Sequence, residues 1–82
     1  MKKSKELKTT ELVSANIRAL MAIQRKTTAA LAVELKVARQ TAGLYTNGSQ
    51  AMTSDQLAIV ATWLGVSVGE LFREEVYELA AA

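Results

Sequence analysis

Basic side chains supply most of the chemistry in this sequence, and they are placed unevenly along it. Nine of the ten Lys and Arg residues lie within residues 1–39, where three acidic residues leave a net charge of +6. Residues 40–82 hold one basic residue and five acidic ones, for a net charge of −4. The first half of the chain is therefore suited to contact an anionic partner.

Catalytic chemistry has few candidates in this chain. Its 82 residues include no His and no Cys, which excludes disulfides, thiolate nucleophiles, Ser-His-Asp catalysis and the usual zinc sites. The acidic residues Glu70, Glu74, Glu75 and Glu78 fall on one predicted helix and have no convergent partner. We therefore expect no enzyme activity, no metal site and no cofactor.

Signals for membrane insertion or export are missing from the sequence as well. No apolar run approaches the roughly 20 residues of a membrane span. The basic start is not followed by the apolar stretch of a signal peptide. We expect a cytoplasmic protein with no membrane partner.

Helical patterns extend over nearly the whole chain, which has no Pro and only four Gly. Apolar residues at helical spacing predict five helices. They are a first helix that ends at residue 24, a second that ends at Leu35, a third over about residues 39–45, a fourth that ends at Leu64, and a fifth that carries Leu71 and Phe72 and continues through Val76 and Leu79. Each is too short to be stable alone, so contacts between helices must hold the fold together.

Polar residues and glycines at the helix boundaries support these limits. Candidate N-caps stand before four of the helices: Thr9 or Thr10, Thr27 or Thr28, Thr53, and Ser67. Gln56 and Glu70 stand three residues after the last two caps, which is the spacing of a capping box. Gly65 suits the end of the fourth helix, and Asn47-Gly48 the end of the third.

The predicted core consists of apolar residues from all five helices and from two of the turns between them. Its members are Ile17, Leu20, Leu31, Ala32, Leu35, Val37, Tyr45, Leu57, Val60, Ala61, Leu64, Val66, Leu71 and Phe72.

The segment from Leu31 to Gly48 has the form of a helix-turn-helix motif, in which a three-residue turn joins two short helices. Its features are Leu31-Ala32, the turn Lys36-Val37-Ala38, and Tyr45 ahead of Thr46-Asn47-Gly48. A second pattern, Leu64-Gly65-Val66-Ser67-Val68 followed by Glu70-Leu71-Phe72, marks the junction of the fourth and fifth helices. With these motifs the chain resembles the Cro/CI-like (XRE-type) helix-turn-helix family of phage repressors and related regulators, over about residues 13–72.

This resemblance implies an all-α fold, a five-helix lambda-repressor-like DNA-binding domain with a helix-turn-helix, over residues 9–73. Residues 1–8 precede it as a flexible basic arm, which is either a solubilising tail or an arm that contacts DNA. Residues 74–82 follow it as a C-terminal helix extension or tail.

The resemblance also implies which residues contact double-stranded DNA. The third helix would enter the major groove N-terminus first and turn four residues toward the bases: Arg39, Gln40, Gly43 and Leu44. Arg pairs bidentately with guanine and Gln with adenine. The residues that would contact phosphates are Thr27, Thr28, Lys36, Thr41, Asn47, Gly48, Arg18, Arg25 and Lys26. The alternative for the charged residues is a solvated surface position, and for Leu44 it is packing against a neighbouring helix.

Three residues depart from the family pattern, and all of them weaken the third helix. Lys36 stands where the family prefers Gly in the turn, and Ala38 where a Ser or Thr would cap the helix. Gly43 lies inside the helix itself. We therefore predict a recognition helix that is less rigid than usual and becomes more ordered on DNA.

The function predicted from these features is sequence-specific regulation of transcription by a phage or prophage repressor that occupies its operator in the bacterial host cell or nucleoid. The alternative is an antitoxin-like protein-interaction module with secondary DNA binding. A homodimer through the fifth helix (Leu71, Phe72, Val76, Leu79) would place two recognition helices about 34–36 Å apart, and a monomer on an asymmetric site is the other arrangement.

The last four residues, Leu79-Ala80-Ala81-Ala82, resemble the ending of the tag that directs bacterial proteins to an ATP-dependent protease. The alternative is the frayed end of an Ala-rich helix, since alanine is the best helix former.

Overall fold

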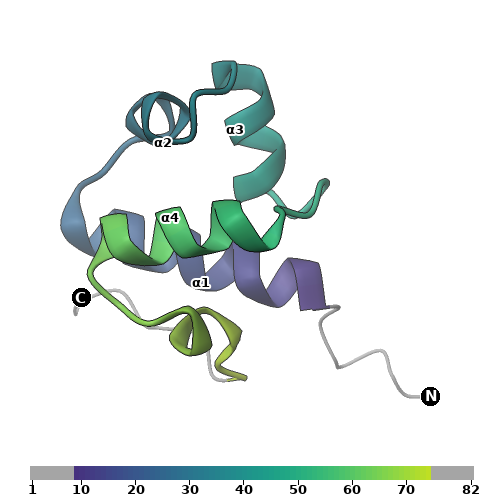
Figure 1. The fold of residues 1–82 in the computed structure, drawn as a ribbon, viewed down its shortest axis with the longest axis vertical. Coiled ribbons are helices and arrows are strands. Elements are labelled where there is room, and N and C mark those ends of the chain that lie inside the picture. Colours follow the sequence, from purple (N-terminus) through teal and green to yellow (C-terminus); the bar gives the residue numbers. More distant parts are fainter. Residues whose placement is uncertain (1–8, 75–82) are drawn as a thin grey trace.

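The computed structural model describes residues 9–74, and every regular element in that range is a helix. In chain order these are α1 (Thr9–Gln24), α2 (Thr28–Leu35), α3 (Arg39–Thr46), α4 (Ser54–Leu64) and the 3₁₀ helix η2 (Val68–Phe72). Figure 1 shows α2 and α3 on one side of the α1–α4 pair and η2 on the other. The predicted all-α fold is confirmed, with α2 and α3 as the two helices of the helix-turn-helix.

Side-chain caps set the start of α2 and α4, as the sequence predicts. Thr27 precedes α2, and its hydroxyl accepts a hydrogen bond from the Ala30 N–H at 3.0 Å. Thr53 and Gln56 complete the predicted capping box of α4, with reciprocal hydrogen bonds of 2.9 and 3.1 Å. Gly65 ends α4 at a φ of 77°, a left-handed conformation that glycine adopts without a Cβ clash.

The first helix begins at Thr9 and ends, as predicted, at Gln24. The predicted N-caps Thr9 and Thr10 both lie inside the helix, so neither is its N-cap, because an N-cap residue has a non-helical backbone. Beyond the helix, Arg25 adopts a left-handed φ of 59°, and the Lys26 N–H donates to the Met21 carbonyl at 2.8 Å. None of the helices in the described range is long and apolar enough to cross a membrane.

The fifth element differs from its prediction. It is a 3₁₀ helix that ends at Phe72, and Ser67 makes no capping hydrogen bond through its side chain. Arg73 has an extended backbone with φ −61° and ψ 136°, which stops the helix. The Asn16 amide donates to the carbonyls of Leu71 and Arg73 at 2.9 and 3.0 Å, so α1 supplies donors that a continuing α-helix would otherwise provide. The predicted continuation of this helix lies outside the described residues.

The buried core confirms most of the predicted positions. Ten of them are buried: Ile17, Leu20, Leu31, Ala32, Leu35, Tyr45, Val60, Ala61, Leu64 and Leu71. Three others pack against this core while partly buried: Val37, Leu57 and Val66. The prediction of Phe72 as a core residue is wrong, since its side chain is 39% exposed. Leu71 takes the inward position of this short helix, and neighbouring side chains of a 3₁₀ helix point about 120° apart.

Four apolar residues that the predicted core leaves out are buried as well. They are Val13, Ala19, Met21 and Ala42. Ala42 is completely buried, so its side chain lies between α3 and the rest of the domain. Because that side chain is small, α3 can pack closely there.

Candidate nucleic-acid interface

The third helix presents one accessible face and one buried face. The four residues predicted to contact bases are all exposed or half-buried: Arg39, Gln40, Gly43 and Leu44. At 3.6 residues per turn, these positions span an arc of about 140°. Ala42, Tyr45 and Thr46 lie on the remaining arc and are buried. The helix therefore offers a guanidinium, an amide and an apolar side chain to one side.

The turn and the start of α3 have the weak points that the sequence predicts. Lys36 adopts a left-handed conformation with φ 59° and ψ 44°, which is strained by about 1–2 kcal/mol in a residue with a Cβ. Ala38 stands at the N-cap of α3 and makes no side-chain cap. Gly43 has a helical position at which an added Cβ would meet no atom within 4 Å. The first N–H groups of α3 thus receive no cap from the N-cap side chain, and the glycine faces open space.

Three of the predicted phosphate-contacting residues converge on one shallow cavity of about 260 Å³ beside the helix-turn-helix. Its lining consists of Arg18, Met21, Ala22, Lys26, Thr28 and Thr46. The Lys26 Nζ lies 4.7 Å from the centroid of the Trp63 ring, and this cation–π contact orients the ammonium group. Thr28 is the first residue of α2, where the helix dipole adds partial positive charge. Two cationic side chains and a helix N-terminus make this cavity attractive to an anion.

Other predicted phosphate contacts have structural roles outside that cavity. The Thr27 hydroxyl caps α2, and the Asn47 Oδ1 accepts a hydrogen bond from the Ser49 N–H at 2.8 Å. Gly48 has a φ of 84° and lies against α1, where an added Cβ would be 3.5 Å from the Glu11 Cγ. Three further candidates are exposed or half-buried away from the cavity: Arg25, Lys36 and Thr41.

The hydrogen bonds that join α1 to α3 are absent from the sequence prediction, which names Arg18 only as a phosphate contact and does not name Ser14. The buried Ser14 hydroxyl donates to the Tyr45 carbonyl at 2.6 Å, and the Arg18 Nη1 donates to the Thr46 carbonyl at 2.5 Å. In the described part of the chain, every buried side-chain nitrogen and oxygen has a partner. The one signal in the sequence was that Ser14 lies within the apolar face of a helix, which indicates a buried hydroxyl. No local pattern predicts that its hydrogen-bond acceptor lies 31 residues away.

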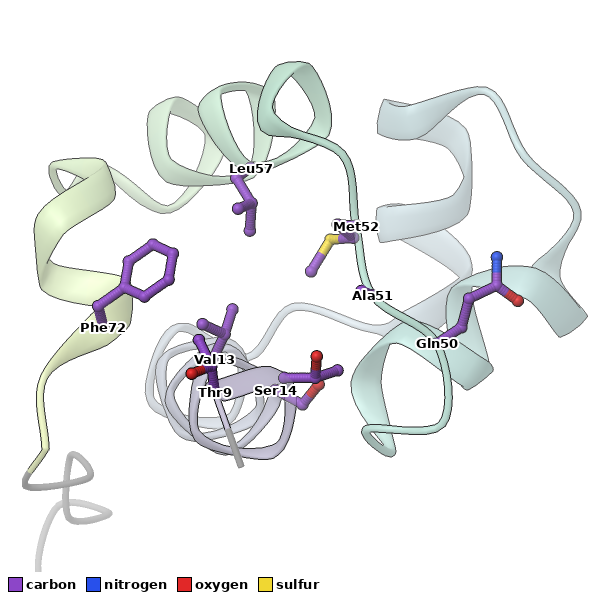
Figure 2. Close-up of a pocket in the computed structure, with 9 residues that line it drawn as sticks. Thr9, Val13, Ser14, Gln50, Ala51, Met52, Leu57 and Phe72 are labelled. Carbon is purple, nitrogen blue, oxygen red and sulfur yellow. The ribbon is translucent and has the colours of Figure 1, made fainter. Parts of the chain in front are cut away.

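A second pocket, of about 190 Å³, lies between the start of α1, the loop before α4 and the end of η2. Figure 2 shows the side chains of Val13, Met52, Leu57 and Phe72 around it. These apolar side chains explain where the half-exposed Phe72 points. Among residues 9–74, no three His, Cys, Asp or Glu residues are grouped so that they could hold a metal ion.

The surface predicted for self-association needs a correction. Leu71 is completely buried and cannot contact a second copy, because it belongs to the core beneath η2. Phe72 is the member of that surface that is accessible within the described range. The other two members of that surface, Val76 and Leu79, lie outside the described residues. So do the predicted degradation tag, within residues 75–82, and the basic arm, residues 1–8.

The fold is shared with proteins of known structure. No protein-family model and no curated protein sequence matches the chain. The clp gene regulator ClgR from Corynebacterium glutamicum matches with a TM-score of 0.75 and 27% identity, over 80% of this chain and 70% of ClgR. The DNA-binding domain of BldD matches with a TM-score of 0.66 and 25% identity, over 79% of this chain and 94% of that domain.

The fold also occurs within an enzyme. Hydroxypropylphosphonic acid epoxidase from S. wedmorenis matches with a TM-score of 0.69 and 29% identity, over 82% of this chain. The match spans 36% of the epoxidase, so this chain corresponds to about a third of that protein. The described helices thus have the fold of a small helix-turn-helix DNA-binding domain, a fold that also forms part of a larger protein.

Proposed function

We propose that this chain regulates transcription by binding double-stranded DNA at a specific sequence, in the manner of the Cro/CI-like repressors that it resembles. The observation that carries the proposal is the accessible face of α3, where Arg39 and Gln40 are exposed at the start of the helix. Their side chains are the ones that bond bidentately to guanine and adenine edges in the major groove. Leu44, 38% exposed on the same face, is suited to contact a thymine methyl group.

Phosphate binding is assigned to the cavity beside α2. Arg18 and Lys26 supply positive charge there, and the N-terminus of α2 at Thr28 supplies backbone N–H groups. Contacts of this kind set affinity and the orientation of the protein on the duplex, while the side chains of α3 select the sequence. The fold shared with ClgR, a gene regulator, and with the DNA-binding domain of BldD supports the proposal that the chain binds DNA.

The proposed mechanism is occupancy of a DNA site. The proposal includes no catalytic step, because the chain has no His or Cys and the exposed groups of α3 are hydrogen-bonding and apolar groups. Occupancy of an operator would exclude RNA polymerase by steric overlap, as in a phage or prophage repressor. A homodimer would require two half-sites about 34–36 Å apart, and a monomer would require one asymmetric site.

In-vitro selection of duplexes from a random library tests the proposal directly. We expect the full chain to enrich one sequence motif, and the symmetry of that motif reports whether a dimer or a monomer binds. Binding should weaken with salt, with a slope of about −0.9 per phosphate neutralised. Failure to enrich any motif at low salt would reject the proposal.

Single substitutions then assign the contacts. Arg39→Ala and Gln40→Ala should each weaken specific binding by about 1–3 kcal/mol and relax the preference at one base position. Lys26→Gln should weaken binding to all sequences about equally and reduce the salt slope by about 0.9. Arg73→Gln is the matched control, since Arg73 directly follows η2. Figure 1 shows η2 on the opposite side of the α1–α4 pair from α3.

A further inference from the structure

Two side chains of α1 bond to the last two residues of α3. The Ser14 hydroxyl donates to the Tyr45 carbonyl at 2.6 Å, and the Arg18 guanidinium donates to the Thr46 carbonyl at 2.5 Å. Ser14 and Arg18 are four residues apart, so they lie one above the other on the same face of α1. Together these two hydrogen bonds form what we call the α1–α3 latch.

The latch acts at the C-terminal end of a helix whose N-terminal end has no side-chain cap. Ala38, at the N-cap of α3, makes no side-chain hydrogen bond, and Gly43 in the centre has open space around it. The last carbonyls of a helix have no partner within the helix, and they need donors from elsewhere when they are buried. Both latch acceptors belong to buried residues, so the donors on α1 contribute to where the C-terminal end of α3 lies, beside the Gln56 amide that donates to the Tyr45 hydroxyl at 3.1 Å.

We propose that Ser14 and Arg18 are positioning residues that set the orientation of α3 and thereby the sequence specificity of the domain. This inference rests on the proposed function, since specificity is defined only for a protein that reads DNA. Ser14 is 1% exposed and uncharged, so it cannot contact DNA and acts only through α3. Arg18 lines the phosphate cavity as well as bonding to Thr46. The Arg18 side chain would therefore contact a phosphate in that cavity and the C-terminal end of α3 at the same time.

Other polar side chains of α1 show that the latch is a distinct device. The Gln24 amide donates at 2.8 Å to the carbonyl of Leu64, the last residue of α4. This bond joins α1 to a helix end in the same way, but it does not involve α3. Gln24→Met, which removes the donor and keeps the length of the side chain, is therefore a matched control for Ser14→Ala and Arg18→Met.

The experiment measures two properties of the full-length variants. The first is the ratio of affinities for the selected duplex and for a scrambled duplex, at several salt concentrations. The second is amide hydrogen exchange over residues 43–47 in the free protein. Circular dichroism melts identify the variants that remain folded. Arg18→Lys is the conservative variant: it keeps the positive charge and a hydrogen-bond donor, so it should retain most of the affinity ratio.

We expect Ser14→Ala to lower the affinity ratio by about fivefold, with the salt slope unchanged, and to speed exchange of the α3 amides by a similar factor, the effect of one lost hydrogen bond. Arg18→Met should do the same and also reduce the salt slope by about 0.9. Gln24→Met should change neither the ratio nor the exchange over residues 43–47.

Several results would overturn the inference. One is an unchanged affinity ratio in folded Ser14→Ala, and another is an equal fall in Gln24→Met. If Ser14→Ala does not fold, Arg18→Met decides, and a change in its salt slope without a change in ratio counts against the latch. If the unsubstituted chain enriches no DNA motif, the proposed function fails, whereas amide exchange still decides whether the latch holds α3.

Discussion

Replacement of Gly43 by alanine separates the stability of α3 from its fit to DNA. Gly43 occupies a helical position in the centre of α3, and a Cβ built there meets no atom within 4 Å. Glycine in a helix interior is less favourable than alanine by about 0.8–1.0 kcal/mol. Because no neighbour has to move, Gly43→Ala should realise nearly all of this gain.

The expected gain is measurable in a domain of this size. A stabilisation of about 1 kcal/mol raises the melting temperature of a 60–100-residue domain by roughly 4–8 °C. Urea unfolding followed by circular dichroism should show a higher midpoint at an unchanged m-value. The amides of residues 39–45, which we predict to exchange rapidly in the free protein, should exchange more slowly in the variant.

Binding should change in the opposite direction. Gly43 shares the accessible arc of α3 with Arg39 and Leu44, so the added methyl group would lie between α3 and a duplex bound to that face. We expect a more stable protein that binds the selected duplex at least about fivefold more weakly, because a bidentate base contact is worth about 1–3 kcal/mol and depends on close approach.

Gly69→Ala is the control, since Gly69 lies in η2 and an added Cβ there would make only an ordinary contact, 3.9 Å from the Ser67 hydroxyl. It should raise stability by about 0.4–1 kcal/mol and leave binding unchanged. A lower melting temperature for Gly43→Ala would refute the packing argument. A rise in both stability and affinity would show that Gly43 does not serve close approach. Strong protection of residues 39–45 in the unsubstituted protein would refute the predicted flexibility.

Three further predictions concern single sites. Lys36→Gly should stabilise the fold by about 1 kcal/mol in chemical unfolding, because it relieves a left-handed φ of 59°, and a lower melting temperature would contradict this. Thr53→Ala should destabilise the fold by about 0.5–2 kcal/mol through loss of the capping box. Ser67→Ala, which removes a hydroxyl that makes no capping hydrogen bond, should have little effect. Equal losses of stability in the two variants would contradict the assignment of Thr53 as a cap. Ala81→Asp with Ala82→Asp should lengthen the half-life in bacterial cells if the chain ends in a degradation tag, and an unchanged half-life would remove that hypothesis.

The candidate interface could be predicted from sequence to the extent that it depends on local pattern. The spacing of Leu31-Ala32, the three-residue turn and Asn47-Gly48 located α3, and the period of the helix then placed Arg39 and Gln40 on its accessible side. The grouping of Arg18 with Lys26 in one cavity could not be predicted, because they come from α1 and the following turn and meet Thr28 only after the helices pack.

The fifth element shows the same limit in the fold. Ser67 and Glu70 have the spacing of a capping box, yet the chain forms a 3₁₀ helix that ends at Phe72. The carbonyls of Leu71 and Arg73 receive hydrogen bonds from Asn16, which is 55 and 57 residues earlier in the chain. A donor at that distance competes with helix propagation, and no local propensity describes it.

The sequence by itself determined the all-α class, the helix-turn-helix and the starts of α2 and α4, because the hydrogen bonds of Thr27 and Thr53 join atoms within three residues of each other. Only the tertiary structure decided how the ends of α3 and η2 are held. The bonds from Ser14, Asn16 and Arg18 cross between 28 and 57 residues of chain. Their geometry exists only when α1 is packed against those ends, because only the packing of the helices brings each donor to an acceptor so distant along the chain.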